Sequence, residues 1–122
     1  MVAQSSLLDA AALNRLRSFG GEKLLSGMIE LFVKNAPTRA ADAREALDCG
    51  DAAALRAALH ALKSSAGQLG AATVYEACVA GEELASRGDL GECAFHVRRI
   101  EGDLPLACRE LEVIRTASSS AS

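Results

Sequence analysis

The last part of the chain carries the pattern that most limits the fold. Between residues 93 and 114, apolar side chains recur at alternating intervals of four and three: Cys93, Val97, Ile100, Leu104, Ala107, Leu111 and Ile114. This spacing places all of them on one side of an α-helix. Such a seam is typical of a helix packed nearly parallel or antiparallel to its neighbours. Pro105 interrupts the pattern, and we expect a slight bend there.

Three further amphipathic segments precede this helix. They are predicted from Glu22 to Cys49, from an Asp51 N-cap to at least Ala66, and from Ala71 to Arg87. Gly-Asp pairs at 50–51 and 88–89 separate the segments, since Gly ends one helix and Asp caps the next. Pro37 lies inside the first segment, which we expect to be kinked there or divided in two.

A shorter apolar pattern at residues 7–18 predicts a leading helix, ended by Gly20-Gly21 and packed across the end of the others. Residues 1–6 are expected to be flexible. Residues 117–122 contain only Ser and Ala and are expected to be disordered. The expected fold is all-α: an up-down-up-down four-helix bundle within residues 7–116, with a short additional N-terminal helix.

Composition limits the function classes. A chain of 122 residues is one domain, and half of its residues are apolar. The net charge is −3 and the bases form no stripe, so we expect no nucleic acid partner. No apolar run approaches the roughly 18 residues of a membrane span, and no signal-peptide pattern opens the chain. We therefore expect a cytoplasmic domain without membrane contact.

The cysteines and aromatic residues predict packing roles. Widely spaced cysteines in helical sequence indicate buried free thiols and no zinc site or disulfide framework. They are Cys49, Cys78, Cys93 and Cys108. The few scattered aromatic side chains are expected to serve packing as well. They are Phe19, Phe32, Tyr75 and Phe95.

His60 is one of two histidines and lies within the second of these segments, which begins at the Asp51 N-cap. A helical projection puts an apolar stripe on one side of this segment: Leu55, Leu59, Leu62, Ala66 and Leu69. His60 lies opposite the middle of that stripe, so we expect it to face solvent. The residues around it are small or basic: Ala53, Arg56, Ala57, Lys63, Ser64 and Gly67.

This exposed imidazole suggests phosphate chemistry. The chain has no Gly-rich phosphate loop, no His-Glu-x-x-His motif and no nucleophile elbow. A neutral imidazole nitrogen is a nucleophile toward an activated phosphoryl group. Arg56 at i−4 and Lys63 at i+3 could balance the charge of that group. The second histidine, His96, is expected to be a surface residue without a role.

Residues 60–71 resemble the signature of histidine-containing phosphotransfer (HPt) domains, His-x-Leu-Lys-Gly-Ser-[Ala/Ser]-x-x-[Leu/Ile]-Gly-Ala. The matching positions are His60, Leu62, Lys63, Ser65, Ala66, Leu69, Gly70 and Ala71. Ser64 departs from the pattern, because the family usually has Gly there. Its hydroxyl could alter partner approach or bond a phosphoryl oxygen. Weaker similarity extends over most of the chain.

The resemblance implies a four-helix bundle that relays phosphoryl groups between Asp residues of response-regulator receiver domains. It implies His60 as the phosphoacceptor and Lys63 as the charge-balancing neighbour. The receiver would dock on the surrounding helix face, with Gly67 leaving room for its loop. This docking face comprises Arg56, Ala57, Ser64, Gly67 and Gln68.

The resemblance also implies that a side chain on the helix after His60 holds the second nitrogen of the imidazole ring. Glu82 is the preferred candidate over Glu83, and an acidic pair facing solvent is the alternative. The Mg²⁺ ion and most catalytic groups of such a relay belong to the receiver. We therefore expect a monomeric domain with no cofactor and no metal site of its own.

Two other functions stay open at this point. The domain could be the phosphoacceptor portion of a chemotaxis-type histidine kinase, with a sensor kinase as donor. It could instead be a non-catalytic helical adaptor whose histidine is incidental. The sequence is compatible with a free-standing phosphotransfer intermediate and with a piece of a hybrid sensor kinase.

Overall fold

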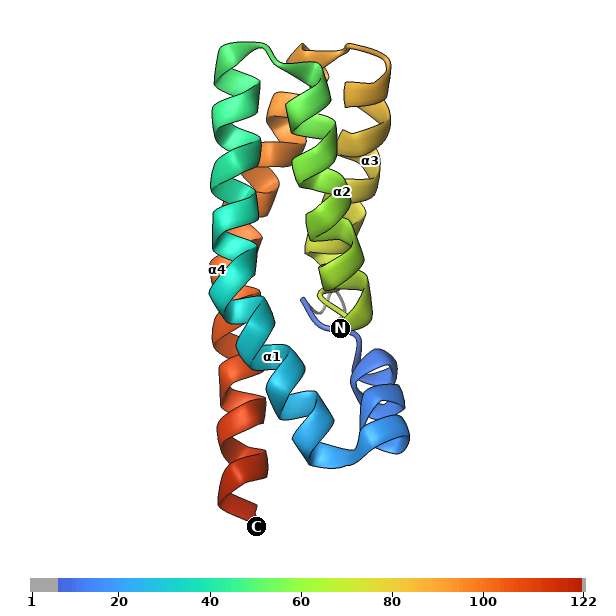
Figure 1. Cartoon of the computed structure of the whole chain (residues 1–122), viewed down its shortest axis with the longest axis vertical. Helices are drawn as coiled ribbons and strands as arrows, with labels where there is room; N and C mark the ends of the chain where they lie inside the picture. Colours follow the sequence, from blue (N-terminus) through green and yellow to red (C-terminus); the bar gives the residue numbers. More distant parts are fainter. Residues whose placement is uncertain (1–6, 122) are drawn as a thin grey trace, which may run out of the picture.

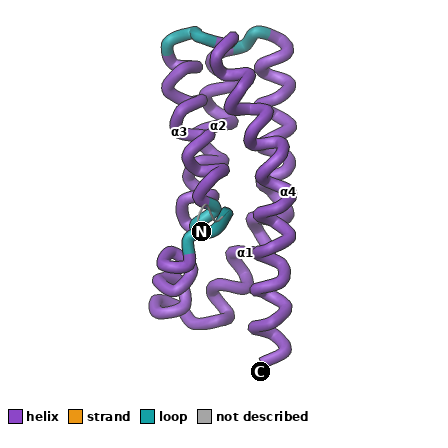
Figure 2. The backbone as a smooth tube through the Cα atoms, turned by 180° about the vertical axis from the view of Figure 1, so that it is seen from behind, coloured by secondary structure: helices purple, strands orange, loops and turns teal. Residues whose placement is uncertain are grey.

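The structure, a computed structural model, describes residues 7–121, with side chains to residue 117. It consists of α1 (Ala10–Cys49), α2 (Ala52–Gln68), α3 (Ala72–Ser86) and α4 (Leu90–Ala121). Each helix packs on the one before it, and α4 returns to pack on α1. Figures 1 and 2 show the long α1 and α4 side by side, with the shorter α2 and α3 completing the bundle. The predicted all-α four-helix bundle is confirmed.

The leading helix is the first piece of α1. Gly21 interrupts α1 with φ 75° and ψ −171°, as the Gly-Gly pair predicts. The piece begins at Ala10 and not at Leu7, because Asp9 is its N-cap and accepts a hydrogen bond from the Ala11 N–H at 3.0 Å. Figure 1 shows this piece near the end of the bundle where α2 meets α3.

The residues before Ala10 fasten the leading helix to the bundle. Asp9 N–H donates to the Gly70 carbonyl at 2.7 Å, and Ala72 N–H donates to the Leu7 carbonyl at 2.8 Å. These bonds hold residues 7–9 against the α2–α3 turn, so the chain is extended there and cannot be helical. The predicted start at residue 7 is therefore wrong by one turn.

The prolines do not divide their helices. Gly21 is the one residue of α1 with non-helical dihedral angles, and Pro37 lies within the continuous second piece. A proline removes one backbone hydrogen bond from a helix. Burial of Ala36, Ala40 and Ala43 in the bundle offsets that loss. The alternative of two helices meeting at Pro37 is wrong, and α4 likewise continues past Pro105.

The C-terminal end differs from the prediction. The α4 backbone is helical to Ala121, where disorder was expected from residue 117. Extending an existing helix adds one backbone hydrogen bond per residue without the cost of nucleation, so α4 continues through these residues. The predicted flexible residues 1–6 and the last residue, Ser122, lie outside the described residues.

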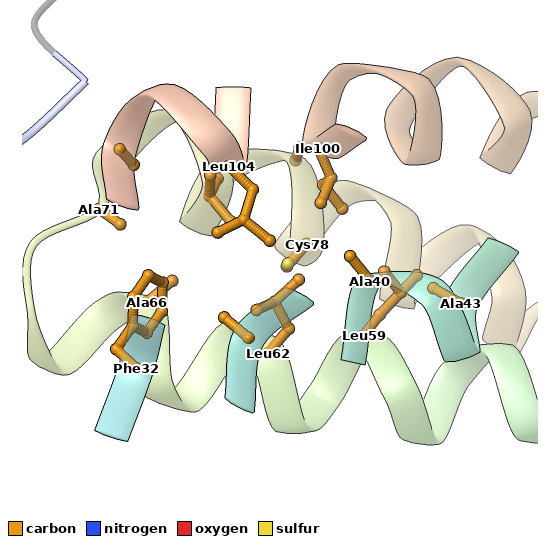
Figure 3. Packing of buried hydrophobic residues seen from close by; sticks show 14 of the residues in the cluster. Phe32, Ala40, Ala43, Leu59, Leu62, Ala66, Ala71, Cys78, Ile100 and Leu104 are labelled. Carbon is orange, nitrogen blue, oxygen red and sulfur yellow. The ribbon is translucent and has the colours of Figure 1, made fainter. Parts of the chain in front are cut away.

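The core lies between all four helices. Leu55, Leu59 and Leu62 of α2 are fully buried, and six of the seven seam residues of α4 are buried. Figure 3 shows Leu62, Cys78 and Leu104 lying toward the same interior from α2, α3 and α4. This burial confirms that the apolar stripe of α2 faces inward, and it turns the opposite side of α2 outward.

Two packing predictions are wrong in part. Cys78 and Cys93 are buried free thiols, but Cys49 is exposed and Cys108 is half-buried. Phe32 is buried, whereas Phe19 and Phe95 are 88% and 64% exposed. Within residues 7–121, no helix combines the length and the apolar composition that crossing a bilayer requires.

Candidate functional site

The outer face of α2 presents His60 to solvent. The His60 side chain is 62% exposed, while its neighbour Leu59 is fully buried. Helix α3 packs close beside this face because Gly81 has no side chain. A Cβ atom at Gly81 would lie 2.9 Å from Leu59 Cδ1. This close approach brings the next residue, Glu82, within reach of His60.

Glu82 links His60 to Lys63. Its Oε2 lies 2.8 Å from His60 Nδ1, and its Oε1 lies 2.7 Å from Lys63 Nζ. The Glu82 side chain is only 14% exposed. Glu83 instead points away and pairs with Arg87 at 3.5 Å. The structure therefore places the preferred candidate, Glu82, against the imidazole ring.

The charge of Glu82 determines how the imidazole is protonated. Burial acts to raise the pKa of Glu82, but hydrogen bonds from Lys63 and His60 outweigh it and hold the pKa below its ordinary value. An ionised carboxylate only accepts hydrogen bonds, so His60 Nδ1 carries the proton and donates. In the neutral ring, Nε2 then carries the lone pair.

Lys63 lies deeper than the sequence suggests. Its side chain is 29% exposed, and its ammonium group pairs with Glu82. The hydrogen bond to Glu82 raises the pKa of Lys63, so the ammonium stays charged. The positive charge of Lys63 therefore lies close to the imidazole, because both side chains contact the same Glu82 carboxylate. Sequence reasoning placed Lys63 and Glu82 each near His60 and missed their contact with each other.

The predicted docking face is exposed along α2. Its members Arg56, Ala57, Ser64, Gly67 and Gln68 are all exposed. Ser64 Oγ donates to the His60 carbonyl at 3.3 Å, so its hydroxyl is engaged with the helix backbone. Arg56 is exposed and forms no ion pair with another residue whose side chain the structure describes.

Tyr75 of α3 occupies part of the space beside Gly67. A Cβ atom at Gly67 would lie 3.2 Å from two atoms of the Tyr75 ring. The expected room for a partner's loop is therefore bounded by an aromatic side chain that is 41% exposed. The sequence predicts only a packing role for Tyr75, and its partial exposure differs from that prediction. Its spacing of seven from Glu82, two helical turns, would have placed both on one face of α3.

The described residues offer no obvious metal centre. No group of three His, Cys, Asp or Glu side chains between residues 7 and 121 could hold an ion. The second histidine, His96, lies on α4, half-buried, with its ring edge-on to Phe95 at 5.1 Å. Its Nδ1 is buried and has no hydrogen-bond partner among the described residues. His60 and His96 therefore have very different surroundings.

The fold and the exposed, carboxylate-bound histidine agree with the comparison to known families. Residues 27–117 match the Hpt domain family. This is well over half of the chain, and the chain belongs to the Hpt domain family.

The backbone is similar to the crystal structure of histidine-containing phosphotransfer protein B (HptB) from Pseudomonas aeruginosa PAO1, with a TM-score of 0.86. The two chains are 24% identical over 93% of this chain and 98% of that one, a likeness that shows the fold. No curated protein matches the sequence.

Proposed function

We propose that this Hpt domain relays phosphoryl groups between Asp residues of response-regulator receiver domains, with His60 as the phosphoacceptor. The supporting observation is the hydrogen bond of 2.8 Å between His60 Nδ1 and Glu82. It assigns the proton to Nδ1 and leaves the Nε2 lone pair on a ring that is 62% exposed. Family membership supports the class of reaction.

The transfer step follows from this protonation state. The Nε2 lone pair attacks the phosphorus of an aspartyl phosphate, an N–P bond forms, and the P–O bond to the aspartate breaks. The aspartate carboxylate leaves with the electron pair. The imidazole gains positive charge while Nδ1 keeps its proton, and the Glu82 carboxylate stabilises that charge. Attack by the Asp of a second receiver reverses the step.

Lys63 and the docking face complete the proposal. Lys63 balances the charge of the phosphoryl group from its position beside Glu82. The receiver covers Arg56, Ala57, Ser64, Gly67 and Gln68 while its Asp approaches Nε2. The domain needs no cofactor of its own, and the Mg²⁺ ion belongs to the receiver. It works as a monomer in the cytoplasm.

A labelling assay tests His60 directly. The domain is incubated with a panel of receiver domains carrying radiolabelled phosphate, and wild type is compared with His60→Gln and His96→Gln. We expect acid-labile, base-stable label on wild type and His96→Gln, and none on His60→Gln. Label that persists on His60→Gln would contradict the proposal. Label from a histidine kinase alone would instead indicate the phosphoacceptor part of a kinase, and no label from either donor would indicate an adaptor.

A further inference from the structure

Phe19 creates an unusual apolar surface at the end of the bundle. At 88% exposure, it is the most exposed large apolar side chain among the described residues. It lies just before the Gly21 break, at the end of the leading helix. Together with Leu16 it lines an open groove of about 830 Å³ between that helix and the C-terminal end of α2.

This groove is continuous with the docking face around His60. Gly67 and Gln68 of that face also line the groove. Gly67 follows His60 by two helical turns, about 10 Å along α2. A protein that brings an Asp to His60 and extends toward the end of α2 therefore meets Phe19 next.

A specific interface is larger than the α2 face around His60, so a docked partner has to contact the neighbouring surface as well. A stable protein–protein interface buries about 800 Å² on each partner and has aromatic anchors near its centre. The α2 face around His60 carries mainly small and polar side chains, which supply little apolar area. Two exposed aromatic side chains border this face, and Phe19 at 88% exposure offers a more accessible anchor than Tyr75 at 41%. Phe19 also precedes residues 27–117, the part of the chain that matches the family, so this anchor is not part of the matched region.

We propose that the Phe19 groove is the second half of the receiver docking surface and selects among receiver domains. It takes an apolar helix or loop of the receiver beside the phosphorylated Asp. Arg15, which also lines the groove, forms no ion pair with another described residue and suits an acidic group at the edge of the receiver's phosphorylation site. This inference rests on the proposed function and adds to it the residue that determines partner affinity.

Kinetics with two phosphodonors separate docking from chemistry. One donor is the phosphorylated receiver that labels wild type fastest, and the other is phosphoramidate, a small molecule that needs no docking surface. For Phe19→Gln we expect an apparent KM for the receiver about tenfold higher, with unchanged kcat. Labelling by phosphoramidate should equal that of wild type.

Two variants serve as matched controls. Phe95→Gln removes an aromatic side chain that is 64% exposed on α4, two residues before buried Val97 and hence on the outer side of that helix. Phe19→Tyr keeps the ring and should restore the wild-type KM. Both should bind the receiver as wild type does.

Distinct results would overturn the inference. An unchanged receiver KM in Phe19→Gln, with normal phosphoramidate labelling, would refute the Phe19 surface and leave the proposed function intact. An equal loss of labelling rate with the receiver and with phosphoramidate would show that Phe19→Gln disturbs the fold, and this result would also refute the Phe19 surface. A wild-type dimer in sedimentation that Phe19→Gln dissociates, at unchanged KM, would assign the groove to a second copy of the chain. Failure of both donors to label wild type would refute the proposed function itself.

Discussion

His60 Nδ1 and Glu82 Oε2 are 2.8 Å apart, joining α2 to α3 across 22 residues of sequence. This contact fixes the tautomer of the imidazole and connects it to Lys63 through the second carboxylate oxygen. The imidazole, the carboxylate and the ammonium group therefore form one connected unit. Its members can be tested separately because the bundle core beneath them is apolar.

Glu82→Gln is expected to slow phosphotransfer. The amide oxygen can still accept from Nδ1, but the negative charge that stabilises the developing imidazolium is lost. A hydrogen bond to a charged group contributes about 1.5–3 kcal/mol, which corresponds to roughly tenfold or more in rate. Single-turnover transfer from a phosphorylated receiver measures the change. Glu83→Gln, at the exposed neighbouring carboxylate, should keep the wild-type rate, and equal rates for both variants would contradict the orienting role.

Lys63→Ala is expected to reduce the transfer rate or the lifetime of phosphohistidine while the bundle stays folded. The side chain is 29% exposed and pairs only with Glu82 among the described residues, so its loss removes charge and little packing. Phosphohistidine decay and thermal unfolding are measured on the same sample. An unfolded variant would show that Lys63 is chiefly structural.

Stability should depend on pH through Glu82. The pKa of Glu82 is lower in the folded state than its ordinary value of 4.5. The ionised carboxylate therefore stabilises the folded state fully when the pH is above 4.5. The contribution is lost as the pH falls from 4.5 through the folded pKa. Urea unfolding from pH 7 to pH 3 should show wild type losing more stability than Glu82→Gln. Parallel curves for the two proteins would show that the Glu82 contacts add nothing to folding.

Leu62→Ala should destabilise the bundle by about 2–5 kcal/mol, because the side chain is fully buried. Urea denaturation measures the free energy of unfolding. The control is Leu106→Ala at a side chain that is 42% exposed, which should cost much less. Similar costs at the two positions would contradict the assigned inner face of α2.

Gly70→Ala should cost more than Gly88→Ala, although both glycines have positive φ, 68° and 74°. The backbone strain of roughly 1–2 kcal/mol is common to both. At Gly70 the new Cβ would also lie 2.7 Å from the Asp9 carbonyl oxygen, whereas Gly88 has open space. The melting temperatures of the two variants measure this difference. An equal decrease in melting temperature would show that residues 7–9 are not held against this turn.

The helices were determined by local sequence. The α4 seam, the Gly-Asp pairs and the Gly20-Gly21 break each act through neighbouring residues, so their positions were predictable. The outward direction of His60 followed from the same local periodicity, since burying Leu59 and Leu62 turns the opposite side of α2 to solvent. The prediction failed where tertiary contacts outweighed local preference, at residues 7–9, and of the two alternatives at Pro37 only the division into two helices was wrong.

Only the tertiary structure decided what surrounds His60. The ion pair of Lys63 with Glu82 depends on the register and rotation of α3 against α2, which the close approach at Gly81 allows. The place of Phe19 beside Gly67 depends on the leading helix being tied to the α2–α3 turn. Hydrophobic periodicity determines which side of each helix is buried, but it does not determine how two helices align along their axes.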